Sequence, residues 1–352
     1  MSVSQFNIHS FRNIQQAQLS LHPSFNLFYG KNGSGKTSLL EALYLLSAGY
    51  SFKTRETRPL IRYGDPHLTV FARTMDDETI SIRKINAGPT QVYLNSQSCL
   101  NSSMLARFLP CLVFYQDIFQ VIDAGPSLRR SLLDWGVFHV KHDYHHLWRE
   151  YRHVLKQRNA LLRQKPNRKA IIPWDLQLVR LAHDLDHLRK TYFKDWKLVF
   201  QAYLQQLSDL ECTIEYYRGW RERGEELGDI LEEQFVADCQ RQYTQSGAHQ
   251  ADIRIETAHS TAKQGLSRGQ QKIILIALKL AQGHLLNKNC LYLFDDMTSE
   301  LDLTHIQRVI ECLKGIKGQK MITVLNNNSL DTQMCGLDAN YYLIENGVVM
   351  SN

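Results

Sequence analysis

The stretch Gly30-Lys31-Asn32-Gly33-Ser34-Gly35-Lys36-Thr37 decides the fold, because it fits the phosphate-binding loop (P-loop) of nucleotide-binding proteins. Its glycines let consecutive backbone N–H groups wrap a triphosphate, and they permit the unusual dihedral angles of such a loop. The Lys36 ammonium is expected to reach the β- and γ-phosphates, and the Thr37 hydroxyl to bind Mg²⁺. We therefore expect nucleotide contacts from Gly30, Asn32, Gly33, Ser34, Gly35, Lys36, Thr37 and Ser38.

The flanking segments support this interpretation, since a genuine P-loop connects a strand to a helix. Residues 25–29 form an apolar run with the length of a short strand. In residues 38–46 the leucines recur at helical spacing. The positive end of that helix would point at the phosphates.

A second apolar run, residues 290–294, ends in the carboxylates of Asp295 and Asp296. Such a run is typical of a buried parallel strand. We expect Asp295 to hold Mg²⁺, directly or through water, and Asp296 to orient the attacking water. The alternative is a helix N-cap or a solvated turn. A P-loop in the same chain favours the nucleotide site, with Lys36, Asp295 and Asp296 as its catalytic residues.

A third segment, Leu266-Ser267-Arg268-Gly269-Gln270-Gln271, precedes an apolar helical stretch at residues 272–286. A Ser hydroxyl and a Gly N–H at a helix start can bind an anion. Because the chain already has a P-loop, a second phosphate-binding segment would be redundant within one copy. It has a purpose if it completes the nucleotide site of a second copy of the chain. We expect Ser267, Gly269 and Gln270 to play this part. A plain Ser N-cap before a Gly turn is the alternative.

Composition restricts the class of protein. The 352 residues suit two domains, or one large domain with an insertion, and the net charge of +6 permits nucleic acid as a partner. Seven cysteines without a C-x-x-C pair indicate reduced thiols. The N-terminus has no signal-peptide pattern, and the longest aliphatic run, residues 273–278, is too short to span a bilayer. We therefore expect a cytoplasmic protein with no membrane partner.

Residues 1 to about 120 are rich in strand patterns, residues from about 125 to 240 are helical and almost free of them, and residues from about 245 to 352 alternate between the two. The helical part carries nine Lys and Arg in residues 141–170, against Asp143 and Glu150. Several of these cations share a helix face, which would give salt-dependent, sequence-independent affinity for DNA. A solvated helical face is the alternative. The expected DNA contacts are Arg149, Arg152, Lys156, Arg158 and Arg163.

Together these motifs resemble the ABC-type ATPase heads of the SMC-like group and, within it, the bacterial RecF family. The resemblance continues in Phe11-Arg12-Asn13, Gly125-Pro126, Gly247-Ala248-His249 and Ser299-Glu300-Leu301-Asp302, in the family's order. It implies that Arg12 and Asn13 belong to the nucleotide site. Gln116 stands where the family usually has Pro, and it is assigned to the site because other ABC heads have a metal-sensing Gln in that loop.

The resemblance implies an α/β fold: a P-loop ABC-type ATPase head, residues 1–120 and 245–352, split by a helical lobe, residues 121–244. It also implies an ATP-dependent homodimer that closes around double-stranded DNA at gaps. Weak, DNA-stimulated ATP hydrolysis would act as a timer for reopening. The family helps RecA load at single-strand gaps, together with RecO and RecR, in DNA repair and the SOS response.

Two other functions use a similar ATPase head. An ABC transporter subunit is disfavoured by the helical lobe and by the lack of a His after Leu325. Another SMC-like complex, for example a nuclease-associated or antiviral one, would need a coiled coil or a further catalytic domain. The sequence has no long heptad runs, and 352 residues are expected to leave no room for either addition.

Overall fold

The computed structural model describes residues 2–99, 101–115, 119–221, 226–257, 265–325 and 337–351. The chain forms two compact units. The head unit comprises residues 1–118, 206–208 and 286–352, and the lobe unit comprises residues 119–205 and 209–285. The sequence prediction ended the lobe at residue 244. The lobe unit extends further, to Leu285, and so takes in a strand and a helix that the prediction assigned to the head.

The first sheet of the head unit is antiparallel, with strand order β2-β1-β4-β5-β6-β7. Apolar and polar residues alternate along β1, so that Phe6 and Ile8 are buried while Gln5 and His9 are exposed. This pattern is typical of a sheet with one face in the core and one in solvent. The strands are β1 (Val3–Phe11), β2 (Ile14–Ser20), β4 (His67–Thr74), β5 (Thr79–Ile85), β6 (Gln91–Leu94) and β7 (Gln97–Ser98).

The second sheet has the order β14-β13-β3-β12-β11-β8, and it is parallel except for β14. Every residue of β11 is buried, which explains its continuous apolar sequence. The parallel register pairs Phe294 of β11 with Ile322 of β12, and Val324 of β12 with Tyr29 of β3. The carboxyl ends of these three strands therefore lie at the same edge of the sheet. The strands are β3 (Phe25–Tyr29), β8 (Cys111–Phe114), β11 (Cys290–Phe294), β12 (Gly318–Val324), β13 (Ala339–Glu345) and β14 (Val348–Ser351).

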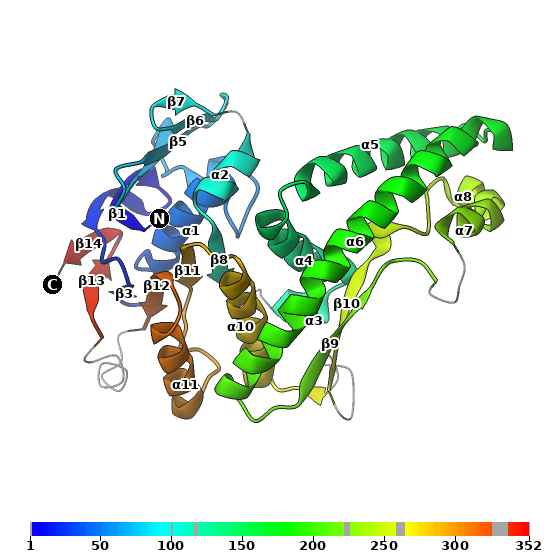
Figure 1. The fold of residues 1–352 in the computed structure, drawn as a ribbon. Coiled ribbons are helices and arrows are strands. Elements are labelled where there is room, and N and C mark those ends of the chain that lie inside the picture. Colours follow the sequence, from blue (N-terminus) through cyan, green and yellow to red (C-terminus); the bar gives the residue numbers. More distant parts are fainter. Residues whose placement is uncertain are drawn as a thin grey trace. The chain divides into compact units, whose positions relative to one another are not determined.

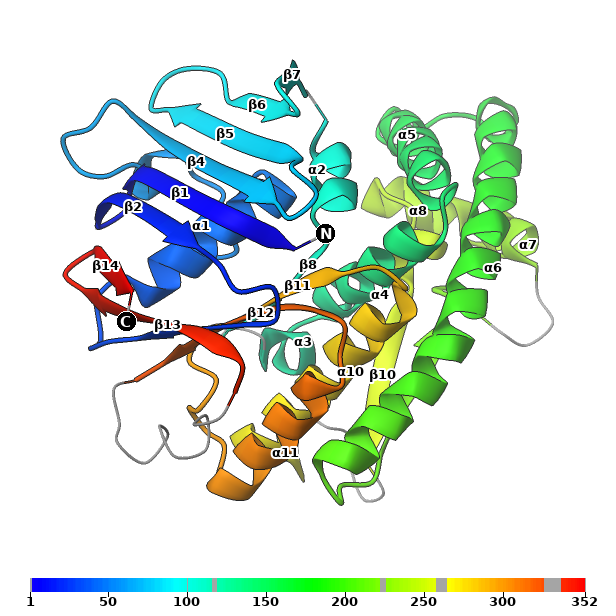
Figure 2. The same cartoon turned by 60° about the vertical axis from the view of Figure 1, so that its left-hand side comes forward.

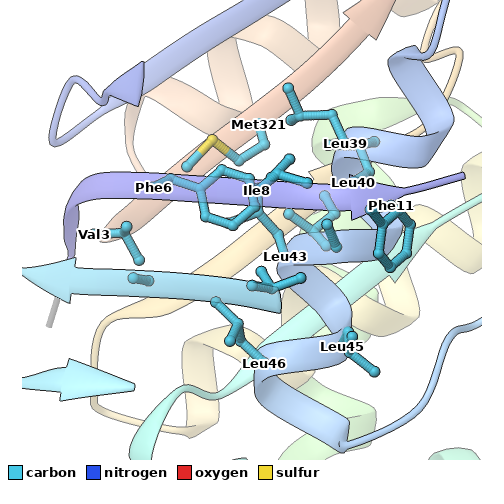
Figure 3. Close-up of a cluster of buried hydrophobic side chains, with 14 of the residues drawn as sticks. Val3, Phe6, Ile8, Phe11, Leu39, Leu40, Leu43, Leu45, Leu46 and Met321 are labelled. Atoms are coloured by element: carbon cyan, nitrogen blue, oxygen red, sulfur yellow. The ribbon is translucent and has the colours of Figure 1, made fainter. Parts of the chain in front are cut away.

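Helix α1 (Lys36–Ala48) contacts strands of both sheets. It is apolar on all sides because both of its faces are covered, and Leu39, Leu40 and Leu43 are fully buried. Figure 3 shows these leucines in one cluster with Phe6 and Ile8 of β1. The other helices of the head unit are η1 (Arg58–Leu60), α2 (Ser102–Phe108) and α11 (Leu303–Lys314).

The lobe unit is mostly helical, and its two longest helices, α5 and α6, lie side by side (Figures 1 and 2). Its helices are α3 (Gln120–Asp123), α4 (Pro126–Val140), α5 (Tyr144–Leu162), α6 (Arg168–Leu207), α7 (Leu227–Glu233), α8 (Phe235–Arg241), η3 (Ala248–Gln250) and α10 (Arg268–Leu285). None of the helices in the described ranges is both long and apolar enough to cross a membrane.

Residues 125–240, which the sequence predicted to be helical and almost free of strands, contain one strand. The segment Cys212–Tyr217 forms strand β9, which pairs antiparallel with β10 (Asp252–Thr257). Cys212 and Ile214 are buried, whereas Thr213 and Glu215 are exposed. This alternation is short, and its partner strand lies outside the segment that was judged helical.

Candidate nucleotide-binding site

The P-loop connects β3 to α1, as the sequence predicted. A Cβ at Gly30 would lie 2.2 Å from the backbone oxygen of Ile344, which leaves no room for a side chain. Gly35 precedes α1 with φ of +121°, a conformation that other residues rarely adopt. Glycine is therefore required at both positions by the local structure.

Lys36 is held against this loop. Its Nζ donates to the backbone oxygens of Gly30 at 2.6 Å and Lys31 at 2.9 Å, and the residue is only 8% exposed. Burial lowers the pKa of Lys36, while the carboxylates of Asp296 and Asp295 act in the opposite direction. The ammonium group is thus fixed where it can donate to a phosphate cradled by the loop.

Asp295 meets the P-loop although the two segments are far apart in sequence. Thr37 Oγ1 donates to Asp295 Oδ1 at 2.9 Å and lies 3.1 Å from Oδ2. Thr323, at the end of the intervening strand β12, donates to Asp295 Oδ1 at 3.2 Å. A hydroxyl and a carboxylate are the oxygen donors that Mg²⁺ prefers, so the residues present fit this metal.

The backbone of Asp296 has φ of +52°, in the left-handed region that residues other than Gly seldom occupy. Its N–H donates to Thr323 Oγ1 at 2.8 Å, which holds this conformation. Such conformations concentrate at functional sites, where the surrounding structure maintains them. The turn places Asp296 on the same cavity wall as Lys36 and Asp295.

Arg12 and Asn13 directly follow β1 and form hydrogen bonds to the P-loop and to α1. Asn13 Nδ2 donates to the backbone oxygens of Gly33 (3.3 Å) and Ser34 (3.1 Å), and its Oδ1 accepts from Ser38 Oγ (2.9 Å). Arg12 Nη2 donates to Glu41 Oε1 on α1 at 2.7 Å. These contacts fix the loop relative to α1.

These side chains line a cavity of about 550 Å³, within the size range of small-molecule sites. The predicted residues on its wall are Arg12, Asn13, Asn32, Gly33, Gly35, Lys36, Thr37, Ser38, Asp295 and Asp296. Sequence reasoning missed Thr323, Lys53 and Ser299, which also line it. A single Thr inside an apolar strand carries no signal of its own, whereas Ser299 begins the segment Ser299-Glu300-Leu301-Asp302 that carries part of the family resemblance. Gln116 lies outside the described residues.

The segment at Ser267 belongs to the lobe unit, where it begins α10. Gln270 N donates to Ser267 Oγ at 3.3 Å, and Ser267 N donates to Gln270 Oε1 at 3.0 Å. These reciprocal bonds form a capping box. Ser267 is thus an N-cap, the alternative considered above, and both side chains are also exposed to solvent. Their contact with a nucleotide remains a prediction.

Most of the predicted DNA contacts lie on one exposed surface of α5. Arg149, Arg152, Lys156 and Arg163 are exposed and line a groove of about 670 Å³, which we call the basic groove. Among the residues that the structure describes, none of these four cations forms an ion pair with a carboxylate. Their charge is therefore available to an anionic partner.

Arg158 was wrongly included among the DNA contacts, since its side chain is 0% exposed. Its Nε donates to Asp175 at 2.7 Å, and its Nη1 donates to Asp238 at 2.7 Å and to Thr244 Oγ1 at 2.7 Å. It lies on the face of α5 that packs against α6 and α8. A buried guanidinium is retained there because two carboxylates compensate its charge.

Comparison with known proteins extends over nearly the whole chain. The model of the RecF/RecN/SMC N terminal domain family matches residues 2–344. The chain is 36% identical to the DNA replication and repair protein RecF of Pseudomonas syringae pv. syringae, over 94% of this chain and 92% of that protein. It is 35% identical to RecF of Shewanella baltica, over 99% of each chain.

Solved structures show the same fold. A structure of the recombination mediator protein RecF with ATP superposes with a TM-score of 0.86 at 23% identity, over 100% of this chain and 97% of that one. An Smc head bound to the C-winged helix domain of ScpA gives 0.64 at 16% identity, over 100% and 98%. The predicted fold class, an α/β ABC-type ATPase head with a helical lobe, is confirmed.

Proposed function

The chain belongs to the RecF family, and from this premise we propose that it is an ATP-dependent DNA-binding clamp of recombinational repair. ATP and Mg²⁺ bind the cavity of the head unit. The observation that carries the proposal is the contact of Thr37 with Asp295, which joins the P-loop to a carboxylate suited to Mg²⁺. Similarity to RecF proteins along the full chain favours this function over a transporter subunit.

Two copies of the chain form the clamp when ATP is bound. The nucleotide held by the P-loop of one copy contacts Ser267, Gly269 and Gln270 of the other. The exposure of Ser267 and Gln270 supports this arrangement. The closed dimer holds double-stranded DNA at a gap, helps RecA to load on the single strand, and works with RecR and RecO in repair and the SOS response.

The test is sedimentation of the purified protein with and without ATP and Mg²⁺, in the presence and absence of gapped duplex DNA. We expect a monomer without nucleotide, and a dimer that carries DNA when ATP is present. A monomer under all four conditions would contradict the clamp.

Asp296→Asn should lengthen the life of the closed dimer, because the amide cannot polarise the attacking water as the carboxylate does. We expect ATP hydrolysis to fall about a hundredfold, with ATP binding nearly unchanged. Single-turnover hydrolysis and dimer dissociation after dilution measure the two effects. Wild-type lifetime and rate in the variant would remove Asp296 from catalysis.

Replacing Arg152, Lys156 and Arg163 together with Ser should weaken binding to duplex DNA by about tenfold or more. Each lost phosphate contact should reduce the slope of log affinity against log salt concentration by about 1. The matched control replaces Lys190, Lys194 and Lys197 of α6 with Ser and removes the same charge. An equal loss of affinity in both triple variants would show that net charge, rather than the basic groove, sets the binding.

A further inference from the structure

A second groove, of about 760 Å³, lies between α5 and α6 of the lobe unit. It shares only Arg149 and His153 with the basic groove. Residues of both helices line it. We call it the interhelix groove.

The interior of the interhelix groove is apolar. Val154 of α5 and Leu181 of α6 line it and are almost fully buried, at 5% and 4% exposure. Leu176 lines it as well, yet it is 68% exposed. Transfer of such a side chain out of water is favourable, so an apolar group placed against Leu176 would be stabilised there.

The charged residues of this groove are mainly cationic. Arg149 and Arg180 are exposed, and neither forms an ion pair within the described parts of the chain. The one carboxylate among the described lining residues is Glu150, whose Oε2 lies 3.6 Å from Nδ1 of His146. Arg180 follows Leu176 by one helical turn, so a cation and an apolar side chain stand next to each other on α6.

We propose that the interhelix groove docks an acidic amphipathic peptide segment of a partner protein. A large apolar side chain of the peptide packs against Leu176 above Val154 and Leu181. Its carboxylates pair with Arg149 and Arg180. This is the helix-in-groove mode of peptide recognition, with charge complementarity that selects against basic segments.

A peptide explains this groove better than DNA does. Phosphates gain nothing from an exposed leucine or an apolar floor, whereas the basic groove offers cations without an exposed large apolar side chain. The proposal does not depend on nucleotide binding or on dimer formation. Its residues Leu176 and Arg180 line the interhelix groove and not the basic groove.

The probe is a fluorescein-labelled synthetic peptide of about 18 residues, long enough to form a helix. It carries leucines on one helical face and glutamates on the other. A second peptide has lysines in place of the glutamates. Fluorescence anisotropy with the full-length protein should show saturable binding of the acidic peptide only. Absence of saturable binding, or equal binding of both peptides, would overturn the proposal.

Variants locate the site. Leu176→Ser should weaken acidic-peptide binding about tenfold, and Arg180→Ser should weaken it several-fold with a smaller salt dependence. Leu198→Ser is the matched control, because Leu198 is 61% exposed on the same helix but does not line the groove. Equal weakening by Leu198→Ser would refute the assignment. Circular dichroism checks that each variant is folded.

Measuring duplex DNA binding by the same variants distinguishes the peptide proposal from the proposed clamp function. Lys156→Ser with Arg163→Ser should weaken duplex binding and leave the peptide affinity unchanged, whereas Leu176→Ser should do the reverse. If Leu176→Ser weakens DNA and peptide equally, the interhelix groove is part of the nucleic-acid surface and the peptide proposal is wrong. If the basic-groove variants leave DNA binding intact, the proposed DNA surface fails while the peptide result stands.

Discussion

Lys36→Ala is expected to reduce the affinity for ATP by about a thousandfold. A hydrogen bond to a charged group contributes about 1.5–3 kcal/mol, and the ammonium can donate to two phosphates at once. In this structure its donors are already directed into the P-loop, at 2.6 Å from the Gly30 oxygen and 2.9 Å from the Lys31 oxygen. Titration with a fluorescent ATP analogue measures the loss. The proposed dimerisation and DNA retention should disappear with it.

The matched control is Lys31→Ala, in the same loop. Lys31 is exposed, and its side chain does not line the nucleotide cavity. The control should bind ATP within about threefold of the wild type, since an exposed charge contributes little through solvent. If Lys36→Ala binds ATP as tightly as this control, the cavity is not the ATP site. Dimers that form without nucleotide would contradict the gating role of ATP.

The head-unit site was largely predictable because each of its parts carries a local signature. The P-loop is one continuous segment. A Cβ at Gly30 would collide with the Ile344 backbone oxygen, and Gly35 has a positive φ that other residues rarely adopt. Asp295 was predictable from the apolar run before it, since a buried parallel strand ends at the same sheet edge as β3. Two short segments and a rule about sheet edges were therefore enough to bring Lys36 and Asp295 together.

Other features depend on tertiary contacts that sequence spacing does not encode. Arg158 has the same composition signal as its basic neighbours, but Asp175 and Asp238, which decide its environment, come from α6 and α8. Strand β9 exists because β10 pairs with it. Thr323 matters because β12 lies between β3 and β11. In each case the deciding partner is distant in the chain.

Ser267 needs a test that separates its two roles. It caps α10 through Gln270, and loss of an N-cap costs about 1 kcal/mol of stability. A substitution that removes the cap would disturb the helix whether or not the residue meets a phosphate. Asp and Asn both cap helices as well as Ser does. Asp is negatively charged and Asn is neutral, so the two substitutions should differ strongly only if an anionic ligand lies close to residue 267.

Ser267→Asp should therefore abolish the ATP-dependent dimer, while Ser267→Asn should retain it within about tenfold. A carboxylate facing a triphosphate costs several kcal/mol, or about a hundredfold or more in dimer affinity. Both variants should bind ATP normally, because the P-loop of the same copy is unchanged. Sedimentation equilibrium with ATP and Mg²⁺ measures the dimer, and thermal unfolding checks the helix. If Ser267→Asp dimerises like Ser267→Asn, no phosphate lies against Ser267 and the shared ATP site is refuted.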